Sequence, residues 1–164
     1  MPLDTSLTFG LCCDHAGFEL KEQVKDWLLD LGFKVTDFGT FSAERCDYPD
    51  FAHQLGRAIE HGSVNRGVAI CGSGNGISMV VNKYPHARAA LCWTPELAQL
   101  GRAHNDANVL SMPARFISTE TAREILLAFL EGEFEGGRHT ARVEKISALL
   151  HSADSEEDPA QNAL

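Results

Sequence analysis

The stretch RGVAICGSGNG, residues 66–76, decides the fold because it joins an uninterrupted apolar run to a glycine-rich turn. Residues 66–71 favour a strand, and the lack of alternation between apolar and polar positions is typical of a strand buried on both faces. The turn at 72–76 opens a helix that we expect to continue to about Lys83. A buried strand that passes through a glycine turn into a helix indicates an α/β protein with a parallel sheet.

The same alternation of strand and helix repeats along the rest of the chain. We expect strands at 7–13, 33–38, 66–71, 88–93 and 109–112. We expect helices at 17–31, 50–61, 95–102, 119–130 and 138–150, besides the one that follows the glycine turn. Right-handed crossovers between these strands predict a Rossmann-like, three-layer α/β/α sandwich around a five-stranded parallel sheet.

Composition and charge narrow the class of protein. The 164 residues suit a single domain, expected at 1–151, followed by a polar, acidic tail at 152–164 that we expect to be disordered. The formal net charge is −9 and no basic patch stands out, which speaks against a nucleic-acid partner. No apolar run approaches the roughly 20 residues of a membrane helix. The N-terminus lacks a basic region followed by an apolar stretch, so we expect a cytoplasmic protein.

The cysteines favour neither disulfides nor a zinc site. They stand at Cys12, Cys13, Cys46, Cys71 and Cys92, an odd count with irregular spacing and no CxxC pair. Three of them lie in apolar runs and are expected to be buried small hydrophobic residues. Cys71 differs because the glycine turn follows it directly.

The glycine turn at 72–76 has two possible interpretations. Glycines let backbone N–H groups approach an anion, and a helix start adds partial positive charge that favours the thiolate form of a cysteine. The turn could therefore hold a phosphate or an enediolate oxygen, with Cys71 as a base. It could equally be a tight strand-to-helix connection beside a buried cysteine. Its spacing matches neither the Walker pattern nor GxGxxG.

Polar residues also follow other strands, and ligands of such folds bind at the carboxyl ends of the strands. Asp14 and His15 suit ring opening and phosphate contact, but Asp14 could simply cap a helix. Tyr48 could line the same pocket or stand at a helix start. We expect residues 14–15, 39–48, 71–76, 93–95 and 112–115 to converge.

Two further polar runs could belong either to a functional site or to ordinary protein surface. His104 could be an acid or base and Asn105 a donor to sugar oxygens, although this run by itself favours an ordinary loop. Arg138 and Arg142 are four residues apart, so one helix face would hold both, and a bound anion would relieve their conflict with the helix dipole. They could instead pair with Glu133, Glu135 or Glu144 on a solvated surface.

Taken together, these runs resemble the type B ribose-5-phosphate isomerases, which are related to the galactose-6-phosphate isomerase subunits. The matching stretches occur in family order from about residue 7 to about residue 150. They are DHAGFELK (14–21), DYP (47–49), CGSGNG (71–76), HNDANVL (104–110) and FEGGRH (134–139).

The resemblance implies an aldose-ketose isomerase that interconverts ribose 5-phosphate and ribulose 5-phosphate through an enediolate. It implies no metal and no cofactor, and a homodimer with two sites at its interface, with pairing into tetramers left open. The catalytic residues it implies are Cys71 as base, Ser73, His104 from the partner subunit, and Asp14. The substrate contacts it implies are His15, Tyr48, Gly72, Gly74, Asn75, Gly76, Asn105, Arg115, Arg138 and Arg142.

Departures from the family pattern bear on the substrate. Ile77 stands where one branch has a glutamate base, so the chain resembles the cysteine branch. Trp93 and Pro113 replace smaller residues near the expected pocket. Alternatives are therefore an isomerase of allose or galactose 6-phosphate or of a tetrulose phosphate, or a non-catalytic subunit that binds a phosphorylated sugar.

Overall fold

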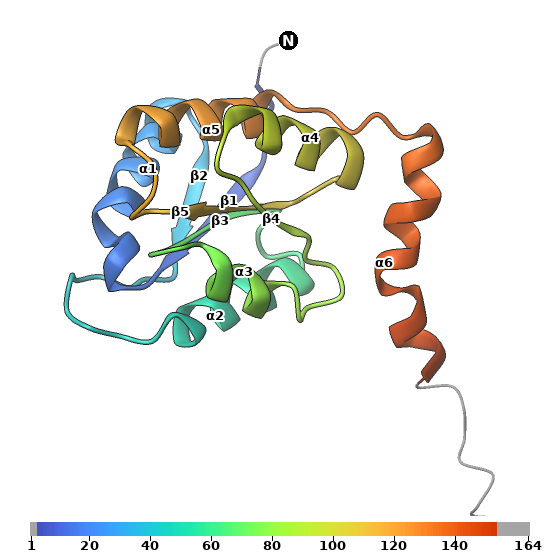
Figure 1. Cartoon of the computed structure of the whole chain (residues 1–164), viewed down its shortest axis with the longest axis horizontal. Helices are drawn as coiled ribbons and strands as arrows, with labels where there is room; N and C mark the ends of the chain where they lie inside the picture. The colour runs from blue at the N-terminus through green and yellow to red at the C-terminus, as the bar shows by residue number, and fades with distance from the viewer. Residues whose placement is uncertain (1–2, 154–164) are drawn as a thin grey trace, which may run out of the picture.

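The computed structural model describes residues 3–153, with side chains to residue 148, and has one sheet of five parallel strands at its centre (Figure 1). The strands are β1 (Thr8–Cys13), β2 (Lys34–Asp37), β3 (Arg66–Cys71), β4 (Ala89–Leu91) and β5 (Val109–Pro113). Their order across the sheet is β2-β1-β3-β5-β4. The connections run to one side after β1 and to the other side after β3, so the switch point of the sheet lies between these two strands.

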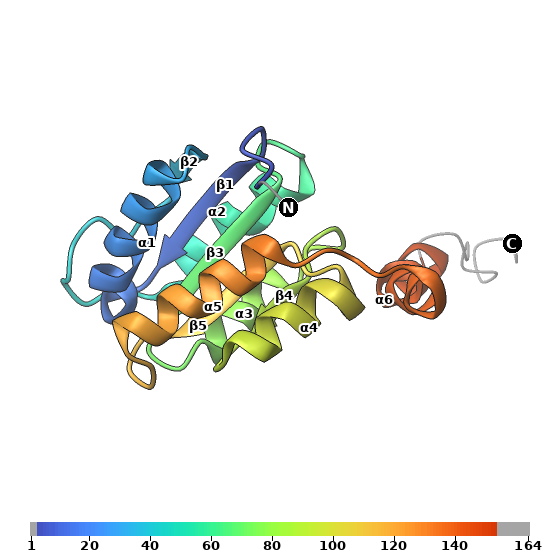
Figure 2. The same cartoon turned by 90° about the horizontal axis from the view of Figure 1, so that it is seen from above.

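Helices cover both faces of the sheet (Figures 1 and 2). One layer contains α1 (Phe18–Asp30), α4 (Pro95–Asn105) and α5 (Thr119–Glu131), and the other contains α2 (Tyr48–Glu60) and α3 (Asn75–Val81). A short 3-10 turn, η1 (His15–Gly17), precedes α1, and another, η2 (Gly137–His139), precedes α6 (Thr140–Ala153). Unlike the other helices, α6 stands to the side of the sandwich.

The two faces of the sheet pack into two separate cores. Alternate residues of β3 divide between them, since Val68 and Ile70 face the layer of α1, α4 and α5, whereas Ala69 and Cys71 face α2 and α3. All four are buried, which explains why this strand shows no polar alternation. The expected Rossmann-like sandwich with five parallel strands is confirmed.

Some element boundaries differ from the expectation. β4 is shorter than 88–93, and α4 runs through Asn105 rather than ending at 102. The extra turn of α4 is stabilised by the ion pair of Arg102 Nη1 with Asp106 Oδ1 at 2.8 Å, and the helix ends where Asp106 adopts a φ of 45°. His104 and Asn105 therefore lie on a helix and not in a loop.

The C-terminal boundary of the domain stays a prediction. α6 continues through residues 151–153, past the limit expected at residue 151, and residues 154–164 of the expected tail lie outside the described residues. Among the described residues, no helix has the length and apolar character that a membrane span requires.

A buried ion pair fixes the turn that leads from β2 to the site. The Lys21 side chain is fully buried, and its Nζ lies 2.5 Å from Asp37 Oδ2 and 2.6 Å from Glu22 Oε1. The other oxygen of Asp37 accepts the N–H of Gly39 at 2.9 Å, and the carbonyl of Gly39 accepts the N–H of Cys13 at 2.7 Å. The lysine therefore anchors the segment after β2 to the end of β1.

We expect Lys21→Met to lower the free energy of unfolding by about 2 kcal/mol, because it removes a fully buried donor to the Asp37 carboxylate. Lys25→Met is the matched control, since Lys25 binds the same two carboxylates with a side chain that is 26% exposed. Its loss should cost under about 1 kcal/mol. Urea unfolding of the two variants measures both values, and equal losses would show that the burial of Lys21 is unimportant.

Candidate active site

Cys71 ends β3 at the carboxyl edge of the sheet and is 4% exposed. Its Sγ accepts a hydrogen bond from the backbone N–H of Gly74 at 3.1 Å. Gly74 makes this bond from the left-handed region, with a φ of 73°, and is the N-cap of α3. The turn therefore directs a backbone N–H at the sulfur from a fixed position, which is the geometry that a cysteine acting as base or nucleophile requires.

The rest of the glycine turn packs against two predicted substrate contacts. A Cβ at Gly76 would lie 2.5 Å from Cζ of Tyr48, so the tyrosine ring rests directly on the turn. Tyr48 is the first residue of α2, which makes it both a helix-start residue and a neighbour of the turn. A Cβ at Gly72 would lie 3.3 Å from Cδ of Arg115, whose own N–H donates to the Gly72 carbonyl.

Two other members of the turn are accessible to a ligand. The Ser73 hydroxyl is half-buried and accepts the N–H of Asn75 at 3.3 Å. Asn75 is exposed and begins α3. Ser73 therefore combines a local turn contact with the exposure that its predicted role requires.

Asp14 and His15 follow β1 at the same edge. Asp14 Oδ1 accepts the N–H groups of Ala16 at 2.9 Å and Gly17 at 3.2 Å, so the capping role considered from the sequence is real. The N–H of Asp14 also donates to the carbonyl of Ile70, which ties it to β3 beside Cys71. The structure thus places the Asp14 backbone next to the turn, while part of its carboxylate is used for capping.

His15 is oriented by a segment far from it in sequence. Its Nδ1 lies 3.3 Å from the N–H of Cys46 and 3.2 Å from the Cys46 carbonyl. The loop after β2 therefore fixes the ring of a half-buried histidine at the edge that carries Cys71. Sequence patterns gave no sign that the backbone of Cys46 has this role.

The other core cysteines are unsuited to reaction at neutral pH. Burial raises the pKa of the Cys13 and Cys92 thiols to about 12. Burial also raises the pKa of the Cys12 thiol well above its usual value. All three are fully or almost fully buried, as expected from their apolar runs. Cys71 differs from these three in its place directly before the glycine turn, where the Gly74 N–H donates to its sulfur.

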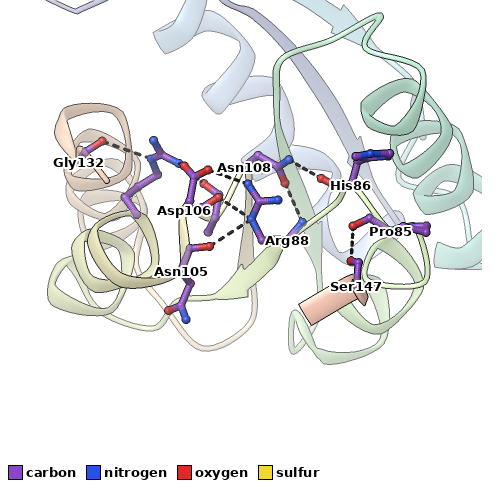
Figure 3. A network of polar contacts seen from close by, with 10 residues as sticks. Pro85, His86, Arg88, Asn105, Asp106, Asn108, Gly132 and Ser147 are labelled. Carbon is purple, nitrogen blue, oxygen red and sulfur yellow. Dashed lines mark hydrogen bonds and ion pairs between the residues drawn. The ribbon is translucent and has the colours of Figure 1, made fainter. Parts of the chain in front are cut away.

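The second set of predicted residues is built around the C-terminus of α4 (Figure 3). Arg88 Nε donates to the carbonyls of Asn105 at 3.2 Å and Asp106 at 2.9 Å, and its Nη2 pairs with Asp106 Oδ2 at 2.8 Å. Asn108 closes the network by accepting the N–H of Arg88 at 2.8 Å. The Asn105 amide points away from this network in Figure 3, so it is free to contact a ligand.

His104 stacks on a residue that the sequence did not single out. The rings of His104 and His139 lie 4.3 Å apart at an interplanar angle of 9°, and each Nε2 is 3.8 Å from Glu135 Oε2. Arg138 Nε donates to His139 Nε2 at 3.3 Å. His139 is 5% exposed, and its burial, with the neighbouring His104 and Arg138, lowers its pKa. A neutral His139 therefore connects the predicted acid-base group to a predicted phosphate ligand.

This cluster suits an anion better than a metal. The donor atoms of His104, Glu135 and His139 lie within 4.8 Å of one another, as in a cation site. However, Arg138 Nε already donates a hydrogen bond to His139 Nε2, and the positive charges of Arg138 and Arg142 both lower the pKa of His139. Two guanidinium groups repel a cation and attract a phosphate.

The two arginines are arranged differently from the expectation. Arg138 lies in η2, ahead of the first residue of α6, so the pair does not share one α-helix face. Both side chains are exposed. Within residues 3–148, no ion pair joins either arginine to Glu133, Glu135 or Glu144.

The two sets of residues lie at opposite edges of the sheet. α4 follows the carboxyl end of β4 and returns to the amino end of β5, so its last turn is at the edge away from Cys71. A helix of 11 residues spans about 16 Å. A single chain therefore does not bring His104, Asn105, Arg138 and Arg142 to the cysteine.

Comparison with known proteins gives a consistent result. The sequence model of the ribose/galactose isomerase family matches residues 9–146. Ribose-5-phosphate isomerase B of Escherichia coli is 46% identical over 143 residues, which cover 87% of this chain and 95% of that protein. D-erythrulose-4-phosphate isomerase of Pectobacterium atrosepticum is 40% identical, over 88% of this chain and 96% of that protein.

A solved structure with a bound sugar phosphate is also similar. Ribose-5-phosphate isomerase B of Mycoplasma genitalium, with bound ribulose-5-phosphate, has a TM-score of 0.86 and 35% sequence identity. The likeness covers 90% of this chain and 98% of that chain.

We expect Gly74→Ala to be far more damaging than Gly62→Ala. Both glycines have a φ near 70°, so a side chain costs roughly 1–2 kcal/mol at either position. At Gly74 the new Cβ would also lie 2.4 Å from Leu91 Cδ1 and 3.1 Å from the Met112 backbone, whereas at Gly62 it meets nothing within 4 Å. The difference between the melting temperatures of the two variants measures the cost of the steric contacts at Gly74. Equal decreases in melting temperature would mean that the turn can move away from β5.

Proposed function

Because this chain belongs to the ribose/galactose isomerase family, we propose that it is an aldose-ketose isomerase that interconverts ribose 5-phosphate and ribulose 5-phosphate. The observation that carries the proposal is the Cys71 sulfur held by the Gly74 N–H at the carboxyl edge of the sheet. Reactions of this class need a base at carbon and fixed positive charge at the oxygen that becomes negative. A thiolate beside a glycine turn supplies both.

The proposed reaction moves one proton between adjacent carbons. The Cys71 thiolate takes the proton from C2 of the open-chain aldose, and the electron pair passes into the C1–C2 bond to give an enediolate. The thiol then returns the proton to C1, while the C2 hydroxyl proton passes to the C1 oxygen. Ser73 and the amides of the glycine turn hold the charged oxygen without rearrangement, which is the most effective use of backbone dipoles.

Ring opening and phosphate binding fall to the remaining residues. Asp14 and His104 shift the proton from the C1 hydroxyl to the ring oxygen, which frees the aldehyde. His15, Arg138 and Arg142, with Arg115 beside the turn, bind the phosphate, and Asn105 and Tyr48 contact the sugar. Gripping the phosphate at one end fixes the reacting carbons at the other.

We propose further that the active unit is a homodimer whose two sites each combine residues of both chains. Support comes from the position of His104, Asn105, Arg138 and Arg142 at the edge opposite Cys71. α6 stands off from the sandwich, with Ile146 55% exposed, and one hydrogen bond from Ser147 Oγ to the Pro85 carbonyl (2.7 Å) links it to the loop before β4. The edge strand β4 is only half-buried. A second copy would cover these surfaces and deliver the second set of residues.

A four-carbon substrate is the second candidate. Trp93 follows β4 at the carboxyl edge, is 40% exposed, and its ring lies 5.3 Å from that of Phe116. Such a pair near Arg115 could shorten the pocket, and the similar protein of Pectobacterium atrosepticum is named for a tetrulose phosphate.

The cytoplasmic location stays a prediction.

We expect the wild-type protein to turn over ribose 5-phosphate faster than D-erythrulose 4-phosphate. Cys71→Ala should lose at least about a thousandfold in kcat, since no other group in the turn can take the carbon-bound proton. Cys92→Ala is the control, because that thiol is buried in the opposite core. Coupled assays with both sugars provide the kcat and KM values. Faster turnover of the four-carbon sugar would assign the second function, and full activity of Cys71→Ala would exclude the thiolate base.

If each active site combines residues of two chains, we expect a mixture of two inactive variants to regain activity. Cys71→Ala and His104→Ala should each be inactive as pure dimers. In a mixed dimer, one site has both substitutions and the other has neither, so refolding an equal mixture should return about a quarter of the wild-type activity. The control mixes Cys71→Ala with Cys71→Ser and should stay inactive. An absence of recovery, with mixed dimers demonstrated by mass, would place both residues in one chain.

A further inference from the structure

Ser111 is a polar residue in the middle of a buried strand. It belongs to β5, every residue of which is buried, and it is 0% exposed. It pairs with Ala69 of β3 and Leu91 of β4, in the centre of the sheet. Burying a hydroxyl costs free energy unless it makes a hydrogen bond, so a serine at this position needs an explanation.

The explanation is a bond to the glycine turn. Ser111 Oγ donates to the carbonyl of Gly74 at 2.8 Å, in a buried position. The only other donor recorded on that carbonyl among the described residues is the N–H of Ser78, at 3.3 Å. The serine hydroxyl is therefore the closer of the two contacts that fix the start of α3.

Gly74 carries the two relevant groups on either side of one Cα. Its carbonyl accepts the Ser111 hydroxyl, and its N–H donates to Cys71 Sγ at 3.1 Å. The backbone of Met112 lies 3.1 Å from where its Cβ would stand, so the residue is pressed against β5. The bond to Ser111 holds the peptide plane that follows the Gly74 Cα, and the packing of this Cα against Met112 limits rotation of the preceding plane, which carries the N–H.

We infer that Ser111 is a positioning residue for Cys71, which holds Gly74 so that its N–H stays on the sulfur. The inference rests on the proposed role of Cys71 as base. It assigns a function to a residue that touches neither sulfur nor sugar and acts through one glycine. Without the hydroxyl, the Gly74 carbonyl keeps its weaker bond to Ser78, and the N–H is free to move off the sulfur.

Ser111→Ala tests this most directly. A lost neutral hydrogen bond corresponds to about a tenfold effect on an equilibrium or a rate. We expect kcat to fall about tenfold with a smaller change in KM, because the Ser111 hydroxyl bonds to Gly74 and not to a residue assigned to the phosphate. Ser63→Ala is the matched control. It also removes a serine bond to a backbone carbonyl (Ala58, 3.1 Å), but at the end of α2, and it should keep the wild-type kcat.

The second readout follows the sulfur itself. The rate at which iodoacetamide alkylates Cys71, measured by peptide mass near neutral pH and divided by the rate at high pH, reports the thiolate fraction. This ratio should fall severalfold in Ser111→Ala, which a purely structural role would not cause. Ser111→Thr and Ser111→Val are equal in shape and differ in the hydroxyl, so threonine should retain a higher ratio and kcat than valine.

The inference is overturned if Ser111→Ala matches Ser63→Ala in kcat and the alkylation ratio, or if threonine and valine behave alike. Alkylation needs no sugar, so this result is independent of whether the isomerase assay succeeds. Full activity of Cys71→Ala would instead refute the proposed base, and the two failures are therefore distinguishable.

Discussion

The N–H of Gly74 points at the sulfur of Cys71, and the residues packed around this peptide restrict its position. β4 and β5 stand so close that a Cβ at Gly74 would overlap the Leu91 side chain and press on the Met112 backbone. Tyr48 presses on the other end of the turn at Gly76, and Arg115 borders its first glycine. A turn confined on three sides presents its amides in fixed directions, and such preorganised dipoles are what an enediolate intermediate requires.

A parallel sheet has a second consequence for the site. Every strand ends at the edge that carries Cys71, and each helix that connects two strands returns the chain to the opposite edge. Residues at the end of α4, such as His104, are thereby separated from the cysteine by the length of the helix. A second chain removes this constraint without any change of fold, which is why the arginines of η2 and α6 belong with the proposed dimer.

Several residues that shape the site do not contact the ligand positions. Lys21 holds the turn after β2, whose Cys46 backbone orients His15. Arg88 and Asp106 brace the end of α4, and His139 supports both His104 and Arg138. Each of these side chains has at least one partner that is distant in sequence, so its role depends on geometry that local patterns do not contain.

The amino-acid sequence by itself determined the element order, the parallel sheet and the glycine turn, because apolar runs such as 66–71 and the glycines at 72–76 act over a few neighbouring residues. It also marked the candidate site residues, through the motifs that resemble the isomerase family. Only the tertiary structure decided that His104 lies on a helix, that Asp14 caps η1, and that His104 and Cys71 face opposite edges. It alone connected Ser111 to Gly74, 37 residues away. Such contacts arise when strands pack side by side, and a one-dimensional pattern does not specify which distant groups packing brings together.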